Sequence, residues 1–263
     1  MFQRDDGADF NLAAISWILN KHWNNPMLNE TIKDYLVEAL IQLPFWLNET
    51  GDLNTMQYWS ENHQIGWKAG KYLIGQAFAS HTDLQSLTFE ASGMTGHESA
   101  LQGKAHTNQW LDYRLRFGFS EFNSDTYGPI ALKAVASVVG LADDPEIRSK
   151  AEKVLNLQLF DQIIGSKGNR ISTARGRAYD EGKIGFRDYQ LMYFVKGLEP
   201  IPVGNSESSM VFLAMQHGYK LPTVFLDVNL MLDSAELAFP IENHFRYLSK
   251  LNKTPLSLRK DLV

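Results

Sequence analysis

The chain has 263 residues, of which 44% are hydrophobic and 12% aromatic, so it can bury a sizeable core without covalent cross-links. It contains no cysteine, which excludes disulfides, thiolate metal sites and cysteine nucleophiles. The formal net charge is −5 and no block rich in Lys or Arg occurs, so we expect no nucleic-acid partner.

The hydropathy of the chain and its two terminal segments indicate whether a membrane span or a signal peptide is expected. No apolar run approaches the roughly 20 residues that span a bilayer, so no membrane span is expected. The opening residues "MFQRDDGADF" lack the basic head and apolar run of a signal peptide. The closing residues "TPLSLRKDLV" do not resemble the natural end of a domain, which indicates a fragment of a longer chain. The location therefore stays open: exported if the chain is a mature form or fragment, and cytoplasmic otherwise.

Helical periodicity dominates the chain in order. A first helix is expected within 9–23, with Asp9 or Asn11 as its cap, and a second within 29–43, capped by Asn29. The apolar stripe expected on the second helix consists of Ile32, Leu36, Ala39, Leu40 and Leu43. A third begins within 58–76; its inward face is traced by Ile65, Ala69, Leu73, Ala77 and Phe78, whereas Gln64, Lys68 and Lys71 are expected to face outward.

Three further helices are expected at 97–117, 126–142 and 143–164. Asp144 caps the last of these, and Pro145 suits its first turn. One side of this helix is expected to be lined by Ile147, Ala151, Leu155, Leu159 and Ile163. Residues 165–185 are rich in Gly and Arg and lack periodicity, which predicts a long loop with a short hairpin, and such loops are often functional. More helices are expected at 186–197, 207–217, 222–233 and 236–251. The pattern predicts one all-α domain over 1–263, built from antiparallel helical hairpins.

The first polar cluster opens the third helix, at Ser60, Glu61, Asn62 and His63. A helix N-terminus presents free N–H groups that suit oxygen-rich ligands. Ser60 and Glu61 are also ordinary first-turn residues, whereas Asn62 and His63 are weak helix formers, which points to a role in a site. The alternative for His63 is a structural histidine held by hydrogen bonds. The flat surfaces expected to bind a sugar beside them are those of Trp59 and Trp67.

The second cluster is "RFGFSEFNSDTYGP", residues 116–129. Glu121 lies between two phenylalanines, so burial would favour its protonated form and a role as general acid. Tyr127 is a candidate proton carrier, and the alternative is a packed tyrosine at a helix entrance. The expected binding residues of this cluster are Arg116, Asn123 and Asp125.

The third cluster is "TARGRAYDEGK", residues 173–183. Arg175 and Arg177 flank a glycine and precede Tyr179, so two guanidinium groups can grip a carboxylate or sulfate. A solvated loop with surface ion pairs is the alternative. Zincin, nucleotide-hydrolase and α/β-hydrolase motifs are missing from the sequence, and no ligand spacing argues for a metal or a cofactor.

At "WSENHQIGWKAGKYLIGQ", "GFSEFNSDTYGP" and "ARGRAY" the chain resembles large bacterial proteins of unknown function with predicted (α/α) toroid domains. More distantly it is similar to alginate- and heparinase-type polysaccharide lyases. That resemblance implies a toroid fold, an acidic polysaccharide as partner and no cofactor. By this likeness Asn62 neutralises a uronate carboxylate, His63 or Tyr127 moves protons, and an arginine adds positive charge.

Three functions follow as hypotheses. The first is a lyase that cleaves uronate-containing glycans by β-elimination. The second is a glycoside hydrolase that pairs Glu61 with Glu121 or Asp125. The third is a helical module that binds glycans or acts as a scaffold without chemistry. All three depend on whether the separated clusters meet in space.

Overall fold

The computed structural model describes residues 6–49, 55–167, 170–171, 173–180, 206–225 and 227–228. Within these residues the fold is mostly helical, which confirms the all-α prediction. The helices are the 3₁₀ helix η1 (Ala8–Asn11), α1 (Leu12–Trp17), the π-type η2 (Ile18–His22), α2 (Glu30–Ile41), α3 (Glu61–Ser80), α4 (Gly96–Phe117), α5 (Tyr127–Leu141), α6 (Pro145–Ile164) and α9 (Ser206–Gln216). Two antiparallel hairpins pair β1 (Thr88–Phe89) with β2 (Met94–Thr95) and β3 (Ser166–Lys167) with β4 (Arg170–Ile171).

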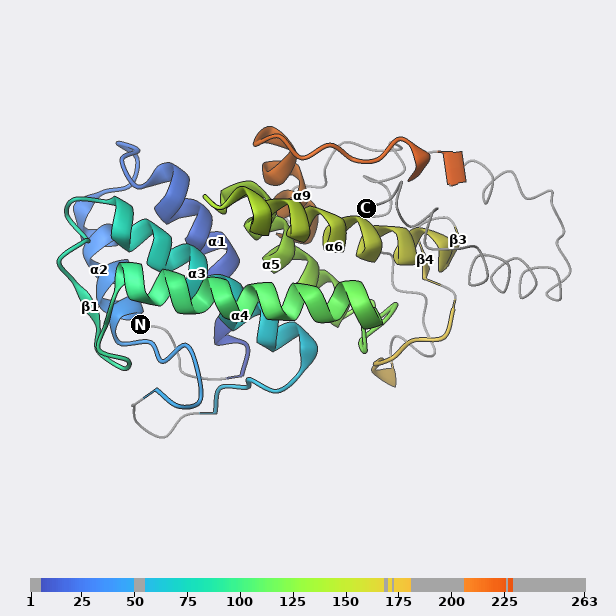
Figure 1. Cartoon of the computed structure of the whole chain (residues 1–263), viewed down its shortest axis with the longest axis horizontal. Coiled ribbons are helices and arrows are strands. Elements are labelled where there is room, and N and C mark those ends of the chain that lie inside the picture. The colour runs from blue at the N-terminus through green and yellow to red at the C-terminus, as the bar shows by residue number, and fades with distance from the viewer. Residues whose placement is uncertain are drawn as a thin grey trace, which may run out of the picture.

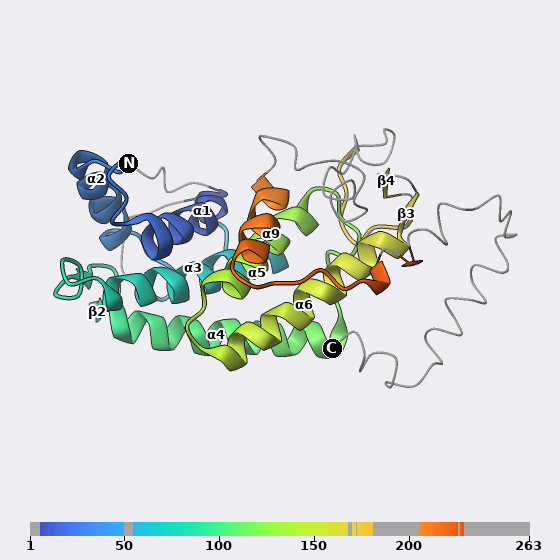
Figure 2. The same ribbon diagram turned by 90° about the horizontal axis from the view of Figure 1, so that it is seen from above.

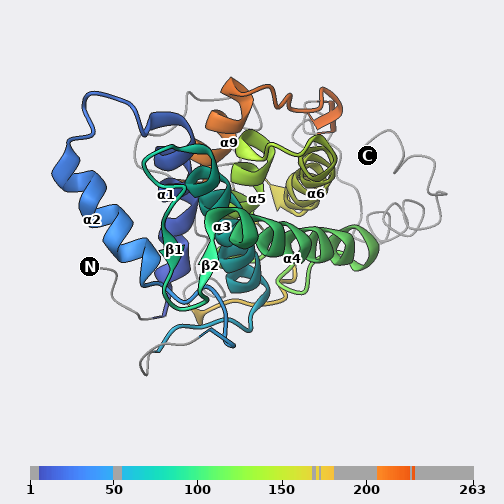
Figure 3. The same cartoon turned by 60° about the vertical axis from the view of Figure 1, so that its left-hand side comes forward.

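Helix α3 lies at the centre, and α1, α4 and α5 pack around it (Figures 1 and 3). All five residues predicted to face inward on α3 are buried. The outward placement of Lys71 was wrong, because this side chain is 3% exposed and its ammonium group pairs with Glu49 and Gln102. Periodicity misplaced Lys71 because α3 is covered on more than one side.

Helices α3 and α4 run antiparallel side by side at very close range (Figure 1). A Cβ added to Gly75 of α3 would lie 2.5 Å from the backbone nitrogen of Ala100 on α4. A Cβ added to Gly103 of α4 would overlap the backbone of Tyr72 on α3. Glycine at these positions therefore lets the two backbones touch, and this contact fixes how the end of α4 meets the start of α3.

Capping residues set the helix starts, as the sequence predicted for two of them. The Asn29 side chain accepts a hydrogen bond from the Ile32 amide at 2.9 Å. Asp144 accepts from the amides of Glu146 at 2.8 Å and Ile147 at 3.0 Å. Such caps stabilise a helix by typically about 1 kcal/mol each, so these boundaries follow from local chemistry.

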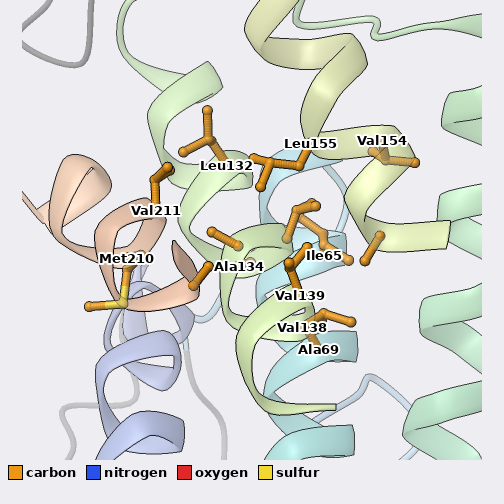
Figure 4. Packing of buried hydrophobic residues seen from close by; sticks show 14 of the residues in the cluster. Ile65, Ala69, Leu132, Ala134, Val138, Val139, Val154, Leu155, Met210 and Val211 are labelled. Atoms are coloured by element: carbon orange, nitrogen blue, oxygen red, sulfur yellow. The ribbon is translucent and has the colours of Figure 1, made fainter. Parts of the chain in front are cut away.

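A large core cluster surrounds α5, where α3, α6 and α9 converge (Figure 4). Helix α9 packs on α5 on the side away from α4 (Figure 2). The predicted inner stripe of α6 is confirmed, since every member is at most 4% exposed: Ile147, Ala151, Leu155, Leu159 and Ile163. A second core cluster joins the N-terminal helices to the other side of α3.

Other expectations had mixed outcomes. The helix expected at 207–217 and the hairpin expected within 165–185 are confirmed by α9 and by β3–β4. The β1–β2 hairpin was not predicted, and Ile32 in the predicted stripe of α2 is 44% exposed. The helices expected at 186–197 and 236–251 lie outside the described residues, as does half of 222–233. In the described ranges, no helix combines the length and the hydropathy that a membrane crossing requires.

Candidate functional site

The three polar clusters meet at one place, where α4 ends and α3 begins. The first turn of α3 contacts the loop 118–126, which joins α4 to α5, and the segment 173–180 packs on that loop. Contacts within this group connect residues 50 to 60 positions apart in the chain. The sequence hypotheses required this convergence of the clusters.

Glu61 fastens the start of α3 to the loop. Its carboxylate, whose side chain is 5% exposed, accepts hydrogen bonds from the Ser120 amide and hydroxyl, both at 2.7 Å, and pairs with the Arg114 guanidinium. The Glu121 amide is a further donor at 3.4 Å. Because several donors hold this carboxylate, Glu61 acts as a buried acceptor that orders the loop.

Glu121 reaches back to the same turn of α3. Its carboxylate accepts from the Asn62 backbone amide at 3.0 Å and from the Asn62 side-chain amide at 2.8 and 3.0 Å. The Arg177 guanidinium lies 3.0 Å from the same carboxylate. An amide and a guanidinium therefore converge on one carboxylate, which is the recognition geometry that an acidic ligand needs.

Gly176 explains why two arginines can approach this loop. Its amide donates to the Phe122 carbonyl at 2.9 Å, and a Cβ at this position would overlap the Ser120 carbonyl oxygen. Arg175 on one side pairs with Asp125 at 2.8 Å, while Arg177 on the other side pairs with Glu121. The Arg-Gly-Arg sequence thus gives one backbone contact between two ion pairs.

Two tyrosines lie beside the Arg177 guanidinium. Its central carbon sits 3.8 Å from the centre of the Tyr127 ring, and the Tyr127 hydroxyl hydrogen-bonds the Tyr179 hydroxyl. Burial, with a contribution from this hydrogen bond, raises the pKa of Tyr127 to about 12, although Arg177 opposes the rise. At neutral pH Tyr127 is therefore a proton donor.

His63 faces a different set of residues from Asn62. Its Nδ1 lies 2.8 Å from the Asp9 carboxylate, its Nε2 lies 3.3 Å from Asp6, and its ring stacks on Phe10 at 5.0 Å. Burial raises the pKa of Asp9, and the hydrogen bond with His63 opposes that rise. Asn62 is therefore connected through Glu121 and Arg177 to Tyr127, whereas His63 contacts η1 and the residue Asp6 before it.

The other expected binding residues divide by exposure and contacts. Trp59 is 71% exposed, so its ring is available to a ligand. Trp67 is fully buried, stacks on Tyr58 at 5.0 Å and donates to the Gln57 carbonyl, so it belongs to the core and its role in binding was misassigned. Asn123 sits at a left-handed φ of 50° and donates to Thr173 at 2.9 Å, which ties the two loops together.

Of two arginines near the end of α4, Arg116 was predicted to bind a ligand and Arg114 was not. Arg116 is exposed and lies over the Phe117 ring, whereas Arg114 turns inward to Glu61. The signal was available: Arg114 follows the buried Trp110 by four residues, and positions i and i+4 share a helix face. Asp9 was also missed, since it was expected only as a cap and is instead the buried partner of His63.

Among the described residues, no group of three or more His, Asp or Glu is arranged to hold a metal ion. Comparison with protein-family models gave no match, and comparisons with curated proteins and with solved structures gave no significant match. The role of the site therefore rests on its own geometry.

Proposed function

We propose that the chain acts on uronate-containing polysaccharides as a lyase that cleaves them by β-elimination. One observation carries the proposal: Asn62 and Arg177 converge on a single carboxylate, that of Glu121, and the Arg177 guanidinium lies over the Tyr127 ring. A uronate carboxylate offers the same two acceptor oxygens as Glu121. A substrate that displaces Glu121 meets donors that are already in position.

The reaction assigns a role to each group. Hydrogen bonds from Asn62 and Arg177 withdraw electron density from the carboxylate and acidify the C5 hydrogen of the sugar. A base removes that proton, the electron pair forms the C4–C5 double bond, and the C4–O4 bond breaks. Tyr127 donates its proton to the departing O4, and solvent restores the phenol afterwards. The raised pKa of Tyr127 keeps this proton in place until it is needed.

His63 is the proposed base. Asp9 orients the ring by accepting the Nδ1 proton, an arrangement that leaves Nε2 as the proton acceptor. The side chain of Asp6, which faces Nε2, is 70% exposed and is free to turn into solvent as a substrate enters. The sugar then lies across the first turn of α3, with its carboxylate toward Asn62 and its C5 hydrogen toward His63.

The toroid arrangement is part of the same proposal. The antiparallel pair α3–α4 and the packing of α5 on α6 and α9 are consistent with helical hairpins stacked around an axis. In such a fold the loops at one end of the hairpins form the substrate site, which suits the position of the loop 118–126.

The test is to incubate the protein with a panel of uronate polymers and follow the ultraviolet absorbance of the unsaturated product. Asn62→Ala and Tyr127→Phe should lower the rate by about 100-fold or more, since positioned acid–base groups contribute about 10² to 10⁴. Tyr35→Phe on α2, at a half-exposed tyrosine, is the matched control and should retain full activity. Folded protein that gives no product across the panel refutes the lyase.

A second candidate, a glycan-binding module without chemistry, is favoured by the charge pairing. Three carboxylates here form ion pairs with arginines: Glu61 with Arg114, Glu121 with Arg177, and Asp125 with Arg175. Such pairing also serves to fasten loops in a protein that only binds. Saturable binding of a uronate oligosaccharide without product would select this module over the lyase.

The glycoside hydrolase alternative gains less from the same contacts. That reaction needs one carboxyl group kept protonated and the other free to attack or activate water. Glu61 is instead held by donors from Ser120, Glu121 and Arg114. Asp125 and Glu121 are each paired with an arginine, so none of the three carboxylates has the surroundings of a general acid.

A further inference from the structure

An open groove of about 320 Å³ lies between α3 and α4. It adjoins the charged cluster that Glu61, Glu121 and Asp125 form with their arginine partners, hereafter the cluster. Its lining comes from Gln64, Lys68, Gln109, Trp110, Tyr113 and Arg114. Arg114 belongs to both places, because its guanidinium pairs with Glu61 in the cluster while its chain lines the groove. A ligand in the groove is therefore in line with the first turn of α3.

Two N–H donors of the groove have no acceptor among the described residues. The Trp110 side chain is 2% exposed, and its indole Nε1 has no hydrogen-bond partner there. The Nε of Arg114 also has none, although the guanidinium lies over the Trp110 ring at 5.2 Å. A buried donor without an acceptor destabilises the protein, so these groups favour a ligand that supplies acceptors.

The groove also carries positive charge and flat aromatic surface. The Lys68 ammonium lies over the Trp46 ring at 5.4 Å, and its hydrogen bond within the described part of the chain is a long one, 3.5 Å to the Gln64 side-chain oxygen. Burial lowers the pKa of Lys68, and an anion bound beside the ammonium would offset that effect. The ring of Tyr113 is 51% exposed, which suits stacking against a sugar.

We propose that this groove is a subsite for the carboxylate of a second acidic sugar, which the Trp110 indole N–H, the Arg114 Nε and the Lys68 ammonium bind together. The inference rests on the proposed function, because it extends the same acidic chain from the cluster onto the face between α3 and α4. A ligand with acceptors and negative charge is required, since all three groups are donors. A neutral sugar would leave the charge of Lys68 unpaired.

The probe is a trisaccharide of galacturonate, with its methyl ester and inorganic sulfate as comparison ligands. We would follow the indole N–H signals by two-dimensional NMR, in which the signal absent from Trp110→Phe identifies Trp110 among the six tryptophans. The trisaccharide should shift this signal in a saturable way, and the methyl ester should not. An equal shift with the ester overturns the proposal, and a shift with sulfate alone replaces a sugar subsite by a simple oxyanion site.

Binding constants complete the test. Lys68→Gln and Trp110→Phe should each weaken trisaccharide binding about tenfold, as expected for the loss of one charge-assisted hydrogen bond. Lys220→Gln, which removes the same charge from an exposed position outside the groove, should bind as the unmodified protein does. Unchanged affinity in both groove variants refutes the subsite. These readouts need no turnover, so failure of the subsite and failure of the lyase are told apart.

Discussion

The ion pair between Glu61 and Arg114 gives the sharpest test of the architecture around the site. Its carboxylate side chain is 5% exposed, its guanidinium side chain is 16% exposed, and two Ser120 donors complete the shell of Glu61. We predict that Glu61→Gln, which keeps the shape but removes the negative charge that pairs with Arg114, lowers the free energy of unfolding by about 3–5 kcal/mol. Removing one partner is costly because the other charge stays buried.

The assay is denaturant unfolding followed by circular dichroism, supported by thermal melting. For a chain of this size 1 kcal/mol corresponds to about 2–4 °C in Tm, so a shift of roughly 6–20 °C is expected. Lys104→Met is the comparison, because Lys104 and Asp144 form a more exposed pair, with side chains 36% and 23% exposed. That variant should cost about 1 kcal/mol or less.

The double variant Glu61→Gln with Arg114→Met decides the cause. If the loss comes from an unpaired buried charge, removing both charges should restore part of the stability, with a coupling energy of about 1–3 kcal/mol. A loss below 1 kcal/mol for Glu61→Gln alone would show that the pair behaves as a surface contact. Glu61 would then be free for the role that the hydrolase hypothesis gives it.

Two further predictions concern the segment 173–180 and its tyrosine contact. Gly176→Ala places a Cβ against the Ser120 carbonyl and 2.9 Å from the Phe122 ring, so the segment should detach and become cleavable in limited proteolysis, at a cost of about 1–3 kcal/mol; unchanged resistance would refute the close approach. The pKa of Tyr127 is raised to about 12, so its contribution to stability is complete below pH 10 and is lost as the pH rises toward 12. The free energy of unfolding, measured across that pH range, should fall less steeply in Tyr127→Phe than in the unmodified protein. Parallel curves for the two proteins would contradict the raised pKa.

Local signals in the sequence predicted what depends on neighbours along the chain. The caps at Asn29 and Asp144 follow from side chains that reach amides two or three residues away. The inner stripe of α6 follows from helical spacing around one covered face. These features determine where helices begin and which face of each helix is buried, so the all-α class could be predicted from the sequence.

What depends on distant partners was not accessible in the same way. Periodicity predicts that Lys71 faces outward. Its ammonium group is instead buried, because it pairs with the buried carboxylate of Glu49, 22 residues earlier. Trp67 looked like a sugar platform beside Asn62, but the segment before α3 folds back and covers it, with Gln57 as its acceptor. The choice between Arg114 and Arg116 likewise depended on which face of α4 meets α3.

The pairing of Glu61, Glu121 and Asp125 with arginines sets a condition on any acidic ligand. A carboxylate can reach Asn62 and Arg177 only by replacing that of Glu121, so the cluster exchanges one ion pair for another and gains little free energy from charge alone. The groove carries no such cost, because the Nε1 of Trp110 and the Nε of Arg114 have no acceptor to give up among the described residues. Binding energy from the groove can therefore offset the displacement of Glu121 at the cluster, which is how remote contacts support chemistry at a reacting centre. On this reasoning a single uronate binds weakly, and a chain long enough to fill both places binds well.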